Sequence, residues 1–161
     1  MQRYLIALGS NVRHARFGPP ERVLAEALHS LDAAGIRVES AAPVMRSAPI
    51  GPSTRRYANS AALVLTPLDP DDLLVRLKSI ERAFGRRPGG QRWASRVLDL
   101  DIVLWSGGCW VSPRLIVPHR EFRRRRFVLA PATAIAPTWR DPLTHLTLRQ
   151  LHRRLLRPHR A

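Results

Sequence analysis

Residues 97–105, with the sequence VLDLDIVLW, constrain the fold more than any other stretch, because apolar residues alternate there with two acids. Successive side chains of a β-strand point to opposite faces, so the alternate apolar residues would share one face while Asp99 and Asp101 share the other. Residues two apart on a strand are roughly 7 Å apart at Cα. Such a strand belongs in a sheet with one apolar, covered face and one face that accepts polar groups.

The rest of the chain supplies further strands and helices, each with its own start and stop signals. Proline and early acids open both central helices, since proline fits the first helical turn and acids favour the positive end of the helix dipole. We expect strands at residues 3–8, 36–45, 57–66 and 97–105, helices that begin near residues 19 and 69 and end at Gly35 and Gly85, loops at residues 46–56 and 86–96, and a closing helix at residues 146–156.

This order of elements predicts an α+β fold with a ferredoxin-like βαββαβ core, in which helices flank a mostly antiparallel sheet. We expect one domain over residues 1–161, with a C-terminal extension after the core. No apolar run approaches the roughly 20 residues that span a bilayer, and the apolar N-terminal stretch is too short for a signal peptide. Because Cys109 is the only cysteine, no internal disulfide can form, and we expect a cytoplasmic protein. We also expect a monomer without a membrane partner.

The charge of the chain is strongly positive and comes almost entirely from arginine. The formal net charge is +15, Lys78 is the only lysine among 27 basic residues, and eleven arginines stand from residue 119 onward against Glu121 and Asp141. A field of this sign attracts polyanions, and the guanidinium group grips phosphate with two parallel hydrogen bonds. The alternative is that the source organism uses arginine wherever lysine would serve. Both explanations stay open.

Asp99 and Asp101 are the candidate metal ligands. Two carboxylates on one face of a strand can hold one hard cation or bracket two, and they leave coordination positions for phosphate oxygens. Mg²⁺ suits such a site because it takes few protein ligands together with substrate phosphates. A pair of this kind also occurs as solvated acids on a half-exposed strand, so the pair alone does not decide between the two interpretations.

A basic loop leads into this strand and favours the metal interpretation. Its charged and aromatic residues are Arg86, Arg87, Arg92, Trp93 and Arg96. Phosphoryl transfer depends largely on positioning and charge neutralisation, which such a loop beside a metal site would supply. The chain has neither a P-loop motif nor a kinase glycine-rich loop. If ATP is used, the fold that uses it is an uncommon one.

The run R-W-x-x-R-x-L-D-L-D-I at residues 92–102 resembles the signature of the 6-hydroxymethyl-7,8-dihydropterin pyrophosphokinase family of the folate pathway. Further motifs are similar to those of the family, in the same order, over nearly the whole chain. They are A-L-G-S-N at residues 7–11, P-I-G-P at residues 49–52 with Tyr57-x-Asn59, Glu81 with Gly85-Arg86, V-P-H at residues 117–119, and Arg125-x-Phe127.

The resemblance implies a reaction in which the pterin hydroxymethyl oxygen attacks the β-phosphorus of ATP and AMP leaves. Asp99 and Asp101 would hold two Mg²⁺ ions, and Arg86 and Arg92 would act from a mobile catalytic loop. The pterin would contact Ser47, Ile50, Tyr57, Asn59 and Phe127, with Tyr57 and Phe127 stacked on its two faces. ATP would be surrounded by Glu81, Arg92, Trp93, Arg96, Ile102, Arg114, His119 and Arg125.

Three positions depart from the family's pattern: Pro88-Gly89-Gly90 in the basic loop, Arg120 after the histidine, and Lys78 in the second helix. These departures bear on ATP affinity and on the dynamics of the basic loop.

Two other functions fit parts of the sequence. A basic nucleic-acid-binding module fits the charge, but the chain lacks a recognised reader motif. A catalytically silent homologue is disfavoured because both acids are present. We therefore expect an ATP-dependent pyrophosphokinase, a transferase without a nucleic-acid partner.

Overall fold

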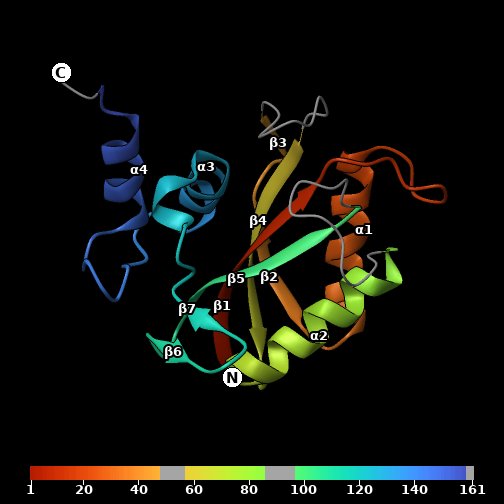
Figure 1. The fold of residues 1–161 in the computed structure, drawn as a ribbon, viewed down its shortest axis with the longest axis horizontal. Coiled ribbons are helices and arrows are strands. Elements are labelled where there is room, and N and C mark those ends of the chain that lie inside the picture. The colour runs from red at the N-terminus through yellow and green to blue at the C-terminus, as the bar shows by residue number, and fades with distance from the viewer. Residues whose placement is uncertain (48–56, 86–96, 159–161) are drawn as a thin grey trace.

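The computed structural model describes residues 1–47, 57–85 and 97–158 (Figure 1). Its strands are β1 (Gln2–Ser10), β2 (Arg37–Ala41), β3 (Met45–Ser47), β4 (Tyr57–Thr66), β5 (Asp99–Trp105), β6 (Trp110–Val111) and β7 (Ile116–Val117). Its helices are α1 (Pro20–Ala33), α2 (Pro70–Ala83), the short 3₁₀ helix η1 (Phe122–Arg124), α3 (Arg126–Ile135) and α4 (Leu148–Leu156).

The central sheet has the strand order β2-β4-β1-β5, and every neighbouring pair is antiparallel. The short strand β3 pairs with the beginning of β4, while β6 and β7 form a separate two-stranded sheet. The strands that precede and follow α1 and α2 thus interleave in the sheet, which is the ferredoxin-like arrangement. The predicted α+β class is confirmed, and β5, which carries the two acids, ends the strand order.

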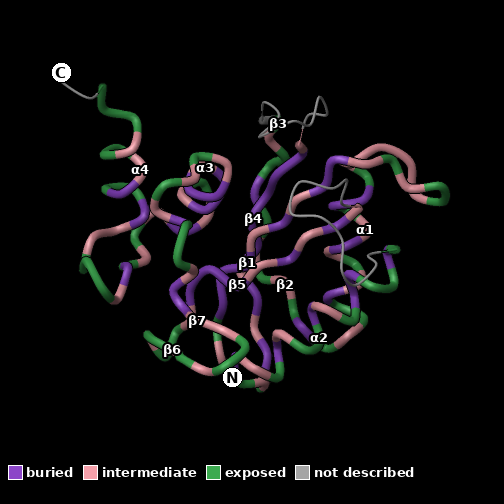
Figure 2. The backbone as a smooth tube through the Cα atoms, viewed as in Figure 1, coloured by how far each residue is buried: buried purple, intermediate pink, exposed green. Residues whose placement is uncertain are grey.

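The sheet separates two apolar cores. Helices α1 and α2 cover one face, whereas α3 and α4 lie on the other (Figure 1). The central strands are buried over much of their length (Figure 2), and alternate residues of β1 belong to the two different cores. The first core joins Tyr4, Ile6, Leu24, Leu31, Leu73, Leu77, Leu100 and Ile102, and the second joins Leu5, Ala61, Val103, Phe122, Leu129, Leu148 and Leu151. The predicted C-terminal extension is therefore a packed layer of the protein.

The helix starts follow the local signals in the sequence. The Asp69 carboxylate accepts a hydrogen bond from the Asp72 amide at 2.8 Å, and Pro70 is the first residue of α2. This arrangement satisfies an amide that a helix start leaves without a partner. Gly85 follows α2 with φ +102°, a conformation that side chains other than glycine rarely adopt.

Two expectations differ from the observed elements. Residues 36–45 form two strands, β2 and β3, and residues 46 and 47 belong to β3 instead of the expected loop. Pro43 lies between the two strands, and proline has no N–H to donate to a sheet ladder. Helix α3 was not expected from the sequence, since Pro131 lies inside it and interior proline disfavours helices.

An ion pair between η1 and the turn before α4 anchors the C-terminal layer. The Arg123 guanidinium donates to both carboxylate oxygens of Asp141, at 2.6 and 2.8 Å. The Asp141 side chain is fully buried. Burial by itself raises the pKa of Asp141, but hydrogen bonds from Arg123, Thr144 and the Leu143 amide outweigh burial, so the pKa lies below its usual value. The carboxylate therefore stabilises the fold in its ionised form.

Asp141→Asn is expected to lower the free energy of unfolding by about 2 kcal/mol at neutral pH, because it weakens charge-assisted hydrogen bonds at a buried site. Because the pKa of Asp141 is lower in the folded state, its ionised carboxylate stabilises the fold fully at pH values above the pKa of the unfolded chain. That stabilisation is lost as the pH falls through the pKa of the folded state. The difference from wild type should therefore shrink below about pH 4. Urea unfolding at several pH values measures it.

Glu39→Gln is the matched control, because it breaks the exposed ion pair between Glu39 and Arg3. We expect a much smaller change in the free energy of unfolding, since exposed ion pairs contribute little. A stability difference for Asp141→Asn that stays constant from neutral to acidic pH would contradict the role given to the ionised carboxylate.

Candidate active site

The two acids of β5 lie on the sheet face that α1 and α2 leave uncovered. Asp99 lies opposite Gly9 of β1, and Asp101 lies opposite Ala7. Directly opposite residues of antiparallel strands share a face. That face is the one on which α3 packs, and both acids are half-exposed there. The shared face expected from the alternation in VLDLDIVLW is therefore present, with two small residues beside the acids.

The same face continues across the sheet to β4. Gly9 lies opposite Asn59 on one side and Asp99 on the other, so these three residues form a row across three strands. A Cβ atom added to Gly9 would stand 3.4 Å from the Asn59 Oδ1 atom. Tyr57 lies two residues from Asn59, on the same face, and pairs with Ser47 of β3. The predicted pterin residues Tyr57 and Asn59 of β4 thus share a face with the acids.

His119 approaches the acids from the segment after β7. Its amide donates to the Val103 carbonyl at 3.0 Å, and its Nδ1 atom accepts from the Glu121 amide at 3.1 Å. The neutral ring therefore carries its proton on Nε2. Burial lowers the pKa of His119, the Asp101 carboxylate opposes burial, and Arg125 lowers the pKa further, so the net shift is downward. His119 is thus a neutral N–H donor at neutral pH, within electrostatic range of Asp101.

Arg125 and Phe127 stand at the start of α3. The Arg125 guanidinium carbon lies 5.6 Å from the centroid of the Phe127 ring, which is the geometry of a cation–π contact. Phe127 is half-buried and packs against the second core. A cation and an aromatic face therefore lie together beside His119, and Arg125 is one of the charges that act on that imidazole.

Three predicted ATP residues lie elsewhere around β5. Glu81 is fully buried in α2, and its carboxylate accepts from the Leu100 amide at 2.8 Å and from the Lys78 ammonium at 3.2 Å. Ile102 is only 2 % exposed, in the core under α1 and α2. Arg114 is exposed, between β6 and β7. The structure does not gather these three with Asp101, His119 and Arg125, and their contact with ATP stays a prediction.

Several predicted site residues lie outside the described residues. They are Ile50 of the pterin set, and Arg86, Arg92, Trp93 and Arg96 of the basic loop with its Pro88-Gly89-Gly90 segment.

Two relevant contacts were not expected from the sequence. Lys78, noted only as a departure from the family's pattern, balances the charge of the buried Glu81 carboxylate. Gly9 lies between Asn59 and Asp99 in the sheet, and a Cβ atom there would come into contact with the Asn59 side chain. The A-L-G-S-N motif that contains Gly9 can be read from the sequence, but the position of Gly9 opposite both residues depends on the pairing of three strands.

The two acids can supply some of the ligands of a hard cation, while phosphate oxygens of a substrate supply the others. Within residues 1–47, 57–85 and 97–158, no three His, Cys, Asp or Glu side chains gather closely enough to hold a metal ion. Asp99 and Asp101 instead offer two half-exposed carboxylates beside the small residues Ala7 and Gly9. Mg²⁺ commonly binds one or two carboxylates and completes its shell with phosphate oxygens and water. The residues present therefore fit Mg²⁺ that arrives with a phosphate ligand.

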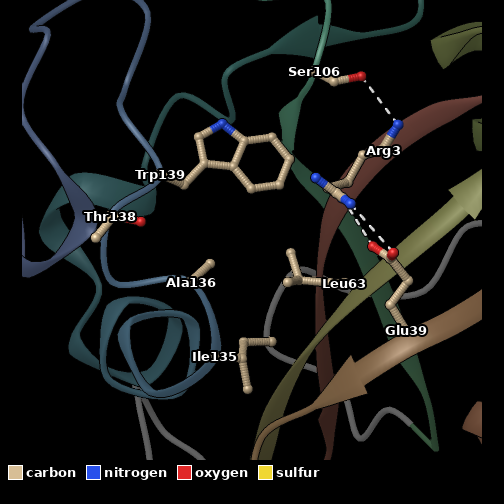
Figure 3. A pocket seen from close by; sticks show the side chains of 8 residues that line it. All are labelled: Arg3, Glu39, Leu63, Ser106, Ile135, Ala136, Thr138 and Trp139. Carbon is tan, nitrogen blue, oxygen red and sulfur yellow. Dashed lines mark hydrogen bonds and ion pairs between the residues drawn. The ribbon is translucent and has the colours of Figure 1, made fainter.

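A cavity of about 650 Å³ lies elsewhere, between the start of β1 and the end of α3 (Figure 3). Trp139 forms one wall, and Arg3 faces it across the cavity (Figure 3). The Arg3 guanidinium is paired with Glu39 at 2.8 Å, so its charge is already balanced. Of the predicted site residues that the structure describes, none lines this cavity. Its lining is Arg3, Glu39, Leu63, Ser106, Ile135, Ala136, Thr138 and Trp139.

The fold and the site together define a class: an α+β protein with paired carboxylates, an imidazole donor and a cation on one sheet face, suited to binding a metal-bound phosphate. The model of the 7,8-dihydro-6-hydroxymethylpterin-pyrophosphokinase (HPPK) family matches residues 5–137. The chain is also similar to curated relatives named 2-amino-4-hydroxy-6-hydroxymethyldihydropteridine pyrophosphokinase. It is 36% identical to the Synechocystis protein, over 91% of this chain and 73% of that protein. It is 39% identical to the Pseudomonas aeruginosa protein, over 88% and 85%. The chain belongs to the HPPK family.

Solved structures agree with this assignment at the level of the fold. The Plasmodium falciparum HPPK-DHPS wild type superimposes with a TM-score of 0.74 at 12% sequence identity. The match covers 95% of this chain and 44% of that one, so the present chain spans less than half of the longer protein. At this identity the likeness concerns the fold alone. Among the described helices, none has the length and apolar character needed to cross a membrane.

Proposed function

We propose that this chain transfers the pyrophosphoryl group of ATP to the hydroxymethyl group of 6-hydroxymethyl-7,8-dihydropterin, giving AMP and the pterin diphosphate. The observation that carries the proposal is the row Asn59–Gly9–Asp99 across three strands. It sets an amide that can recognise a heterocycle beside a carboxylate that can hold a metal-bound phosphate. Family membership supplies the identity of the two substrates.

Asp99 and Asp101 would hold magnesium together with the ATP phosphates; the resemblance implies two ions. A metal ion held by these two acids would supply neutralisation of the phosphate charge at the reacting group. Both acids stand on a paired strand, so the spacing of their Cα atoms is fixed before the substrate arrives. That fixed spacing is the contribution of the chain to the reaction, because phosphoryl transfer is accelerated mainly by positioning and electrostatics.

The nucleotide side of the site would be served by His119 and Arg125. The Nε2 proton of neutral His119 can be donated in a hydrogen bond to a phosphate oxygen, and Arg125 can add two parallel hydrogen bonds. The lowered pKa of His119, caused first by burial, keeps this donor neutral. Electrostatic attraction to ATP at this edge then comes mainly from the arginine.

The pterin would lie between Tyr57 and Phe127, with Asn59 at its amide-like edge. Asn59 is 4 % exposed, so its amide is held in the sheet surface by its surroundings. An amide offers one acceptor and two donors, which matches a ring edge that carries both types of group. Ser47 pairs with Tyr57 at the rim of this slot, and the backbone there can add further hydrogen bonds.

The deciding experiment mixes the protein with Mg²⁺, ATP and 6-hydroxymethyl-7,8-dihydropterin and follows AMP together with the pterin diphosphate. Equal amounts of both products are expected. ADP in place of AMP would mean transfer of a single phosphoryl group and would contradict the proposal. No product from protein that binds both substrates would identify a catalytically silent homologue.

Phe127→Ala is expected to weaken pterin binding by about 2 kcal/mol, since it removes one stacking face. ATP binding should weaken much less, because the Arg125 side chain remains. Equilibrium titration with each ligand measures the two effects. Ile135→Ala, which shortens an apolar side chain at the other end of α3, is the control and should leave both affinities near the wild-type values. Equal losses for pterin and ATP in Phe127→Ala would indicate a general disturbance of the fold.

We also propose that the protein works in the cytoplasm as a monomer. The lone, exposed Cys109 suits a reducing compartment. The substrates would both reach the site from solvent, since the two acids are half-exposed.

A further inference from the structure

The segment after the family region is folded against residues beside the site. The matched family region ends at residue 137, whereas residues 138–158 form a turn and α4, which packs on α3 and η1. Leu148 and Leu151 of α4 are buried in the second core. The helix has its own start signal, because the Thr147 hydroxyl and the Gln150 side chain cap each other's backbone amides. This segment therefore forms a layer that packs on the rest of the fold.

One ion pair links this layer to η1. The Arg123–Asp141 pair is bidentate, and the Asp141 carboxylate also accepts from the Thr144 hydroxyl at 2.7 Å and the Leu143 amide at 3.1 Å. The Arg123 guanidinium carbon lies 4.6 Å from the ring centroid of Phe122, which is fully buried. Both charged partners are therefore held in one geometry by their surroundings.

Backbone hydrogen bonds connect η1 to His119 before it and to Arg125 after it. The Phe122 amide donates to the His119 carbonyl, and the Arg125 amide donates to the Phe122 carbonyl. The Arg125 carbonyl in turn accepts from the Val128 and Leu129 amides of α3. A displacement of η1 would therefore be transmitted to Arg125 and to Phe127, two residues further along.

We propose that residues 138–158 act as a brace for the active site. The Arg123–Asp141 pair holds η1, and η1 sets the positions of Arg125 and Phe127. Arg123 and Asp141 are then positioning residues, which act through η1 and do not contact a substrate. This inference rests on the proposed function, in which Phe127 stacks on the pterin. If it is correct, residues after the matched family region also contribute to the geometry of the active site.

The test compares Arg123→Gln, Arg123→Lys, Phe127→Ala and Thr147→Ala with wild type, at a temperature at which circular dichroism shows all five folded. Pterin binding is titrated with Mg²⁺ and α,β-methylene ATP, an analogue that cannot transfer its pyrophosphoryl group. Arg123→Gln should raise the pterin Kd about tenfold, the effect of a displaced stacking face. The KM for pterin should rise with it, while kcat at saturating pterin changes little. The pterin Kd of Arg123→Lys should lie between those of wild type and Arg123→Gln, because lysine keeps the charge without the paired hydrogen bonds.

Thr147→Ala is the control, since it weakens the start of α4 without touching the ion pair. It should lower the Tm and leave the pterin Kd unchanged. Hydrogen exchange over residues 122–129 should quicken in Arg123→Gln and not in Thr147→Ala. If Phe127→Ala leaves pterin binding intact, the proposed pterin slot is wrong. If Phe127→Ala weakens binding while folded Arg123→Gln keeps the wild-type Kd, the brace is wrong and the pair serves stability alone.

Discussion

Asp101→Asn is expected to reduce turnover by about a thousandfold, the scale of losing a preorganised electrostatic partner of the transition state. The side chain keeps its size, so the loss would come from charge and metal affinity. The fold should remain intact, since Asp101 is half-exposed on a strand whose backbone pairing does not depend on the carboxylate. Removing one of two neighbouring negative charges should even relieve repulsion in the free protein.

Two measurements separate these effects for Asp101→Asn. Turnover at saturating Mg²⁺ reports the catalytic loss, and urea unfolding without Mg²⁺ reports stability. Adding Mg²⁺ with ATP should raise the Tm of wild type by more than that of the variant, because ligand binding stabilises only the state that binds. Glu121→Gln removes another exposed acid, two residues from His119, and should retain near wild-type turnover. Unchanged turnover in Asp101→Asn at saturating Mg²⁺ would exclude the carboxylate as a metal ligand.

Arg92→Ala is expected to lower the single-turnover rate by at least ~100-fold, on the scale of one donor aimed at developing charge. Arg92 lies outside the described residues, so this prediction depends on the sequence: a basic, glycine-containing loop that leads directly into the acid-bearing strand. Charge on the phosphates redistributes in the transition state, so the arginine should matter most for the chemical step. Equilibrium binding of ATP and of pterin should weaken much less than the rate.

Single-turnover kinetics beside titration of both ligands tests the prediction for Arg92. Arg76→Ala is the matched control, because Arg76 is exposed on α2 and has no expected role. It removes the same charge from the same strongly basic chain, and its rate should stay near that of wild type. If affinity falls in Arg92→Ala as much as the rate does, the residue is a binding clamp and the catalytic-loop interpretation is wrong.

Features encoded by neighbouring residues could be predicted from the sequence. The alternation in β5, the Asp69-Pro70 helix start and the glycine after α2 each depend on a few consecutive residues, and each is present in the fold. The split of residues 36–45 into two strands was missed, although Pro43 marks it. Helix α3 was missed because packing on β4 and α4 outweighs the cost of an interior proline.

Features that join distant residues could not be predicted in the same way. The Asp99–Gly9–Asn59 row needs the pairing of three strands, and the Arg123–Asp141 pair needs a turn of the chain back onto η1. In so arginine-rich a sequence, no local pattern singles out Arg123 from its neighbours. The position of Glu81 against the Leu100 amide depends likewise on how α2 packs under β5.

The contact between Glu81 and Leu100 also bears on the solubility of the protein. β5 ends the strand order, and an outermost strand exposes backbone groups with which a second chain can pair and begin aggregation. At Leu100 the backbone N–H is already donated to a fully buried carboxylate. An incoming strand would have to displace that charge from its contacts with the amide and with Lys78. The Glu81 carboxylate thus already accepts one of the backbone N–H groups that β5 could otherwise donate to a strand of a second molecule.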